Sequence, residues 1–155
     1  MNAGEALAAD DRALVITRMF DAPRALVWKA WTDPAHALKW MGPREHPAVS
    51  WQADPRVGGA WRACLRSPDG KEELWQGGIF KEIKAPELMA YTFAWDGGME
   101  TLVNIRFEDL GEKTRMHFRQ TPFSSRQSRD GHQGGWSSAF DRFDDLLAEL
   151  RKHPH

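Results

Sequence analysis

One long amphipathic segment near the C-terminus constrains the fold of this chain more than any other feature. Its large apolar side chains recur at steps of four and three residues, at Trp136, Phe140, Phe143, Leu147 and Leu150. That spacing places them on one stripe of an α-helix, which we predict over residues 129–151. Because most of the preceding sequence is typical of strands, we expect this stripe to be buried against a sheet.

The chain before this helix begins with one strand pattern and two short helical patterns, followed by a long run of strands. The first strand is predicted over residues 14–20, and the helices over 24–31 and 34–40. Gly77-Gly78 predicts a bulge or a bend inside a later strand. Alternating apolar residues between turn sequences predict strands over residues 47–52, 59–67, 73–83, 88–95, 101–107 and 114–119. This order predicts an α+β fold, in which a curved antiparallel sheet wraps around the long C-terminal helix and the two short helices close one end.

The length of 155 residues suits one domain, since a chain of this size buries about 70% of its unfolded surface on folding. Residues 1–12 are Ala-rich and polar without strand alternation, so we predict a flexible N-terminal extension there. A single domain is predicted over residues 13–152.

Composition and charge exclude several classes of partner. The 21 basic and 22 acidic residues are mixed along the chain and leave a net charge of -1, without the basic run that binds phosphates, so we expect no nucleic acid partner. Cys64 is the one cysteine and forms no intramolecular disulfide. With no signal-peptide pattern and no apolar run of membrane-spanning length, we expect a cytoplasmic protein without stable membrane insertion.

The sequence contains no signature of a catalytic or metal centre. The 6 histidines are scattered, without the spacing of zinc ligands. Cys64 lies in the middle of a predicted strand, where a small buried side chain is the favoured interpretation. No serine occurs in a nucleophile elbow, and the Gly-Gly pairs lack the strand-to-helix context of phosphate loops. We therefore predict no catalytic residue, no metal and no cofactor.

The large aromatic residues are the feature of the sequence that indicates a ligand site. The chain has 8 Trp but 1 Tyr, and indole rings either fill a core or line an apolar pocket. Trp40, at the end of a short helix before Gly42-Pro43, suits either use equally well: it caps a pocket mouth or anchors the helix pair in the core. For each strand tryptophan the alternative to a pocket wall is ordinary core packing.

Several local motifs, taken in their order along the chain, resemble those of a known protein family. They span residues 14–150 and comprise Phe20-Asp21-Ala22-Pro23, Val27-Trp28 with Trp31, Trp40-Met41-Gly42-Pro43, Asp54-Pro55-Arg56-Val57-Gly58-Gly59-Ala60-Trp61-Arg62, Pro68-Asp69-Gly70, Gly77-Gly78-Ile79-Phe80-Lys81-Glu82-Ile83, Pro86-Glu87-Leu88 and Gly135-Trp136. The chain resembles bacterial proteins similar to the C-terminal domain of the activator of the Hsp90 ATPase, within the SRPBCC or START-like superfamily. The resemblance implies a helix-grip fold with a deep cavity between the sheet and the C-terminal helix.

Members of this superfamily bind lipids, sterols, polyketides or other apolar molecules. Together with the many tryptophans, the resemblance leads us to expect an apolar or aromatic ligand between the sheet and the C-terminal helix. Trp136 and Phe140 are expected to face this cavity, and Phe143, Leu147 and Leu150 to pack on the sheet. The expected ligand-binding residues are Trp40, Trp51, Trp61, Trp75, Phe93, Trp95, Trp136 and Phe140.

Two other functions remain as alternatives at this point. The family's name implies a protein-interaction module that acts on an Hsp90-type chaperone, although the sequence contains no counterpart of the activator's separate N-terminal domain. A cyclase or hydrolase needs an acid or base inside the cavity, for which His46, His117 and His132 are the histidine candidates. Exposed edge strands of the sheet also offer a surface for a homodimer.

Overall fold

The computed structural model describes residues 9–152 of the chain, with side chains from residue 11 onward. Of the expected N-terminal extension, residues 1–8 lie outside the described part, while Ala9–Arg12 forms a short helix, α1. The remaining elements are β1 (Leu14–Phe20), α2 (Arg24–Thr32), α3 (Pro34–Trp40), β2 (Ala48–Ala53), β3 (Ala60–Arg66), β4 (Glu73–Lys84), β5 (Leu88–Trp95), β6 (Thr101–Asp109), β7 (Thr114–Thr121) and α4 (Arg126–Lys152). Within the described residues, none of the helices is both long and apolar enough to span a bilayer.

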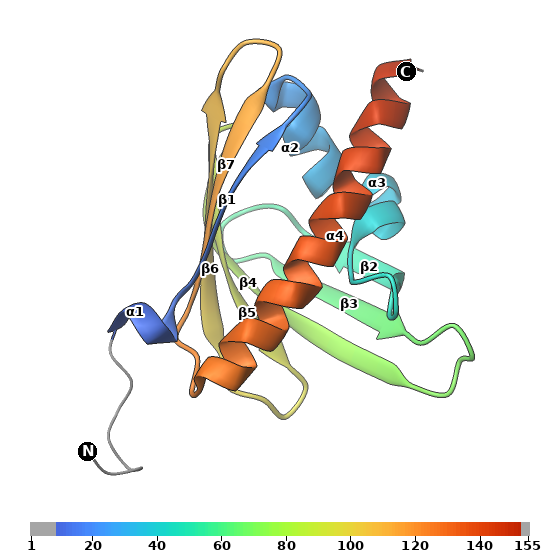
Figure 1. Ribbon diagram of the computed structural model, residues 1–155, viewed down its shortest axis with the longest axis vertical. Coiled ribbons are helices and arrows are strands. Elements are labelled where there is room, and N and C mark those ends of the chain that lie inside the picture. Colours follow the sequence, from blue (N-terminus) through green and yellow to red (C-terminus); the bar gives the residue numbers. More distant parts are fainter. Residues whose placement is uncertain (1–8, 153–155) are drawn as a thin grey trace.

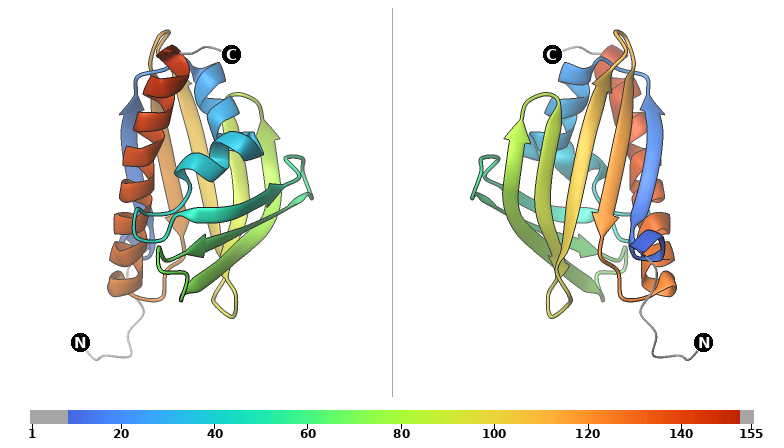
Figure 2. Two further views of the ribbon diagram at one scale, coloured as in Figure 1. Left: turned by 90° about the vertical axis from the view of Figure 1, so that its right-hand side faces the viewer. Right: turned by 90° about the vertical axis from the view of Figure 1, so that its left-hand side faces the viewer.

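The strands form one seven-stranded antiparallel sheet in the order β1-β7-β6-β5-β4-β3-β2, and α4 runs diagonally across its concave face (Figure 1). β1 closes one edge by pairing with β7, from Leu14 opposite Gln120 to Phe20 opposite Thr114. Figure 2 shows how strongly the sheet curves, so that β2 and β3 run across the direction of β6 and β7. The architecture confirms the predicted α+β helix-grip fold.

The sheet curls where β4 passes very close to its neighbours. A Cβ atom on Gly78 would lie 1.8 Å from the carbonyl oxygen of Thr92, and one on Gly77 would lie 2.7 Å from that of Trp61. Only glycine therefore fits at these two positions. The register shift of the β4–β5 ladder comes slightly later than the Gly-Gly pair, between Phe80 and Glu82.

The largest concentration of buried aromatic rings in the core lies beneath the C-terminal half of α4. Phe143 is fully buried, with ring centroids 4.9 Å from Phe20 and 4.5 Å from Trp40, and Trp31 lies 4.7 Å from Trp40. The rings join α4 to β1, α2 and α3 in one cluster, which closes this end of the molecule. α4 begins at Arg126, three residues before the predicted start. The aromatic cluster continues into its N-terminal half as far as Trp136, whose ring centroid lies 4.8 Å from that of Phe118.

Candidate ligand-binding site

A cavity of about 350 Å³ lies between the N-terminal half of α4 and the sheet. Three parts of the chain line it: the α3–β2 loop at one end, β3 to β5 as the floor, and α4 as the opposite wall. The lining residues are Met41, Gly42, Pro43, His46, Leu65, Leu74, Gln76, Phe93, Trp95, Gln127, Ser128, Gly131, His132, Gly135, Trp136 and Ala139.

Trp136 is held in the cavity wall by a buried hydrogen-bond network. Its indole Nε1–H donates to Gln120 Oε1 at 2.8 Å, and the Gln120 Nε2 amide donates to Thr101 Oγ1 at 2.9 Å. The Thr101 hydroxyl in turn donates to the carbonyl oxygen of Phe93 at 3.0 Å. Since every member is paired, the network fixes the indole without leaving a buried polar atom unsatisfied.

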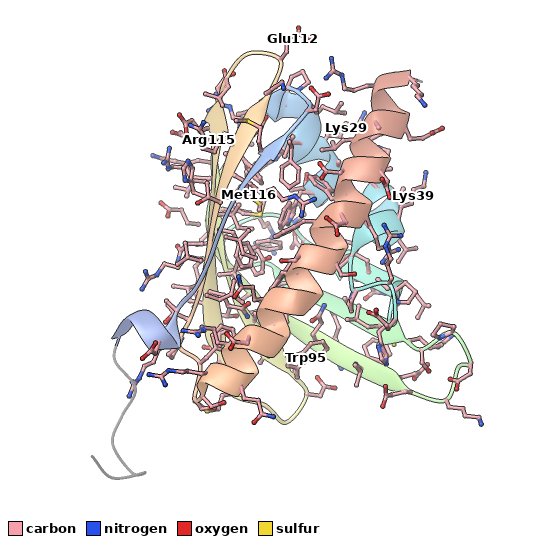
Figure 3. The ribbon with its side chains drawn as sticks, viewed as in Figure 1. Lys29, Lys39, Trp95, Glu112, Arg115 and Met116 are labelled. Atoms are coloured by element: carbon pink, nitrogen blue, oxygen red, sulfur yellow. The ribbon has the colours of Figure 1, made fainter. Side chains whose placement is uncertain are left out.

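Trp95 and His132 form a second fixed pair, which separates the main cavity from a neighbouring hollow of about 210 Å³ at the β5–β6 turn. Trp95 Nε1–H donates to His132 Nε2 at 2.9 Å, and His132 Nδ1 lies 2.8 Å from the carbonyl oxygen of Ser128. A carbonyl only accepts, so Nδ1 bears the proton and both imidazole nitrogens are engaged. Figure 3 shows Trp95 beside the N-terminal half of α4.

Small residues on α4 keep the cavity open. Gly131, Gly135 and Ala139 follow one another at four-residue spacing and all line the cavity, because residues four apart lie on one helix face. A Cβ atom added to Gly131 or Gly135 would meet no atom of the described residues within 4 Å. These glycines are therefore not required for close packing, and they leave space between the helix and the sheet.

Arg142 of α4 fixes the loop at the far end of the cavity. Its guanidinium donates to the carbonyl oxygens of Lys39 at 3.0 Å, Met41 at 3.1 Å and Gly42 at 2.7 Å. Burial lowers the pKa of Arg142, with repulsion from Arg44 acting in the same direction. Lys39 lies in the last turn of α3, where the helix leaves carbonyl groups unpaired, and Met41 and Gly42 follow in the loop, so Arg142 ties both the helix end and the loop to α4.

Three of the eight residues expected to bind ligand come together in this cavity: Phe93, Trp95 and Trp136. Trp40 and Phe140 are fully buried in the aromatic core instead. Trp40 also donates from Nε1 to the carbonyl oxygen of Ala30 at 3.0 Å, so it anchors α3 in the core. Of the two α4 residues expected to face the cavity, Trp136 lines it and Phe140 does not.

The structure places the other three expected residues elsewhere on the sheet. Trp51 and Trp61, with ring centroids 5.4 Å apart, border a separate hollow of about 10 Å³, which has room for about one water molecule. Trp75 is 36% exposed on the convex face, where the Arg62 guanidinium lies 4.9 Å from its ring centroid. Arg62 also forms a bidentate ion pair with Asp96.

Sequence reasoning did not select Gln76, Gly131 or Gly135 as site residues, although all three line the cavity. The two glycines carry a signal that was available, since Gly inside a long amphipathic helix lowers helix stability and indicates a local reason for its presence. Gln76 carried no such signal, because an isolated polar residue in a strand is usually exposed.

The histidines proposed as acid or base candidates are all paired. His132 is bound at both nitrogens, His46 lies at the cavity with its Nε2 against the Glu72 carboxylate, and His117 Nε2 lies 3.0 Å from Glu108 Oε1 on the convex face. The pairing with His117 holds the pKa of Glu108 below its usual value. Among the described residues, no three His, Cys, Asp or Glu side chains gather where they can hold a metal ion.

Comparison with known proteins places this architecture in a family. The model of the family described as activator of Hsp90 ATPase homolog 1-like protein, AHSA1, matches residues 21–148, which is most of the chain. The chain belongs to this family. The matched AHSA1-like region includes both the cavity floor and most of α4, and it agrees with a place in the SRPBCC or START-like superfamily. No curated protein matches the chain.

Solved structures share the AHSA1-like fold. A protein from Rhodobacter sphaeroides has a TM-score of 0.79 at 22% identity, over 94% of this chain and 99% of that one. A solution structure from Arthrobacter aurescens has a TM-score of 0.78 at 24% identity, over 99% of each chain. The AHSA1 protein from Silicibacter pomeroyi has a TM-score of 0.78 at 23% identity, over 88% of this chain and 97% of that one. At these identities the likeness concerns the fold.

Proposed function

We propose that this AHSA1-like protein binds an uncharged, mostly apolar small molecule with an aromatic ring, held between the sheet and the N-terminal half of α4. The observation that carries the proposal is the cavity of about 350 Å³ walled by Phe93, Trp95 and Trp136. Its size falls within the range of about 300–1,000 Å³ found for small-molecule sites. The superfamily fold, whose members commonly bind hydrophobic ligands, supports the same conclusion.

The lining favours an uncharged and aromatic ligand. Among the described residues that border the cavity there is no Asp, Glu, Lys or Arg, so a buried ligand charge would have no partner and would be costly. The indole N–H groups of Trp95 and Trp136 are directed at protein acceptors. The half-buried ring of Trp95 and the part of the Trp136 ring that borders the cavity therefore offer apolar carbon, and no unpaired N–H group, to an aromatic ligand.

The same geometry favours binding over catalysis. His132 uses both imidazole nitrogens to hold Trp95 and the Ser128 carbonyl, and a general base needs a free lone pair within reach of its substrate. Holding an apolar molecule requires only the shape and the apolar surface that the cavity provides.

Titration with N-phenylnaphthylamine, an uncharged fluorophore whose emission rises in apolar surroundings, tests the proposal. We expect a saturable rise in emission, weakened about tenfold by Trp95→Ala through loss of ring contact. Trp75→Ala is the matched control, since Trp75 lies on the convex face, and it should bind like the wild type. An emission that rises without saturating, or an equal loss of affinity in both variants, contradicts the proposed site.

The family description supports one alternative function, a protein-interaction module acting on an Hsp90-type chaperone. The ATPase rate of a bacterial Hsp90-type chaperone, measured with and without this protein, tests it. An unchanged rate together with saturable fluorophore binding decides for the small-molecule function. The cytoplasmic location and the homodimer expected from the sequence stay predictions.

A further inference from the structure

Gln76 on β4 is a buried polar residue whose side chain has no hydrogen-bond partner among the described residues. It is 3% exposed and lines the main cavity beside Leu74. Within the described part of the chain, its carboxamide forms no hydrogen bond. Buried side-chain polar groups are nearly always paired, and an amide in this position calls for an explanation.

The carboxamide of Gln76 faces usable space. Unpaired polar atoms that are completely enclosed occur, among the described residues, in Arg24, His36 and Trp51. The amide of Gln76 is not one of these, so it remains accessible from the cavity that it lines. A ligand in the cavity can therefore reach it.

The other polar groups around the cavity are already used or lie toward solvent. His132, Trp95 and Trp136 are bound to protein acceptors or donors. His46 is paired with Glu72. Gln127 is exposed, and Ser128 is half-buried in the first turn of α4. Among the described residues that line the cavity, Gln76 is consequently the deeply buried side chain with free hydrogen-bonding capacity.

We propose that Gln76 determines the specificity of the cavity by hydrogen-bonding one neutral polar group, a phenolic hydroxyl or a ketone, on an otherwise apolar aromatic ligand. This inference rests on the proposed small-molecule function. The carboxamide offers both a carbonyl acceptor and an N–H donor, so it accepts from a hydroxyl and donates to a ketone. A site built to pair such a group rejects an analogue that lacks it, because the amide is then left unpaired.

A matched ligand pair tests this role in the wild-type protein. Naphthol and methylnaphthalene, substituted at the same ring position, differ in a hydroxyl against a methyl group of similar size. In a cavity without a partner, the buried hydroxyl would weaken binding about fivefold to a hundredfold relative to the methyl. We expect instead that naphthol binds at least as tightly as methylnaphthalene, measured from the indole N–H signals in NMR titrations.

Gln76→Met provides the matched protein variant, since methionine has a similar length without the amide. The ratio of the dissociation constant of naphthol to that of methylnaphthalene should be about three- to tenfold higher in the variant than in the wild type. This is the effect of losing one net hydrogen bond. Naphthyl methyl ketone, compared with ethylnaphthalene, should show a shift of the same sign.

The outcomes separate this inference from the proposed function. If both ligands bind the wild type but methylnaphthalene is clearly preferred, or the ratio is the same in Gln76→Met, the role of Gln76 is overturned and the binding function stands. If neither ligand shows saturable binding to the wild type, both proposals fail. Should Gln76→Met not fold by circular dichroism, the wild-type comparison of the two ligand pairs decides alone.

Discussion

Replacing Gly135 by leucine should block the cavity while making the protein more stable. Gly135 lines the cavity from α4, and in the described part of the chain no atom lies within 4 Å of a Cβ atom built there. The larger side chain therefore enters open space instead of clashing. An isobutyl group that displaces ligand carbons at about 0.8 kcal/mol each removes about 3 kcal/mol of binding free energy. This corresponds to roughly a hundredfold rise in the dissociation constant.

The stability should change in the opposite direction. Leucine is a better helix former than glycine by about 0.5 to 1 kcal/mol in a helix interior, and burial of its side chain against the apolar lining adds to this gain. For a chain of this length, each kcal/mol raises the melting temperature by about 2 to 4 °C. A more stable protein that no longer binds ligand excludes unfolding as the cause of the loss.

Gly134→Leu is the matched control. Gly134 precedes Gly135 in the same helical turn but is exposed and does not border the cavity. This variant should gain a similar helix-propensity contribution and bind N-phenylnaphthylamine like the wild type. Thermal melts by circular dichroism and fluorophore titrations of the three proteins complete the experiment. Wild-type affinity in Gly135→Leu, or an equal loss of affinity in both variants, refutes the placement of the ligand against this face of α4.

Further predictions concern the two halves of α4 and its neighbours. Trp136→Ala should weaken fluorophore binding far more than Leu147→Ala, although both cost about 2 to 5 kcal/mol of stability in denaturant melts; the reverse ranking of affinities would put the cavity at the other end of the helix. Arg142→Met should cost about 1 to 3 kcal/mol by the loss of its bonds to the α3–β2 loop, and should also weaken binding, whereas unaltered affinity would mean that the loop holds its position without them. The hydrogen bond from Arg126 lowers the pKa of Asp11 below its usual value of 3.8. The contribution of this pair to folding stability is therefore fully present above pH 3.8, and it is lost as the pH falls through the lowered pKa. Asp11→Asn should therefore lose less stability than the wild type on acidification below about pH 4 in thermal melts, by a small amount because the pair is exposed; equal losses would contradict this role.

The sequence predicted the element order because each element carries its own periodicity. α3 and β5 lie within the bounds expected from local pattern alone, Pro34–Trp40 and Leu88–Trp95. The start of α4 was placed three residues late, since Arg126 to Ser128 are polar and contribute nothing to the apolar stripe that defined the helix. The family resemblance followed from short motifs that sit mainly in turns and helix ends.

The choice of strand face was much harder to predict. In β4 the neighbours Leu74, Trp75 and Gln76 give no clear alternation, and from the sequence Trp75 is the residue of the three that is expected to line the cavity. Pairing of Leu74 with Leu65 and of Trp75 with Cys64 sets the register. Because successive side chains point to opposite faces, Trp75 lies on the convex face while Leu74 and Gln76 line the cavity.

The sequence by itself determined that an amphipathic C-terminal helix would cover a curved sheet, since apolar periodicity depends only on local order along the chain. The tertiary structure alone decided where along that helix packing gives way to a cavity, and it placed Phe140 in the core. Phe140 and Phe143 meet the rings of α2, α3 and β1, whereas Gly131 and Gly135 leave α4 apart from the sheet. One stripe on one helix thus serves both purposes, because the distance between helix and sheet depends on what the rest of the chain places between them.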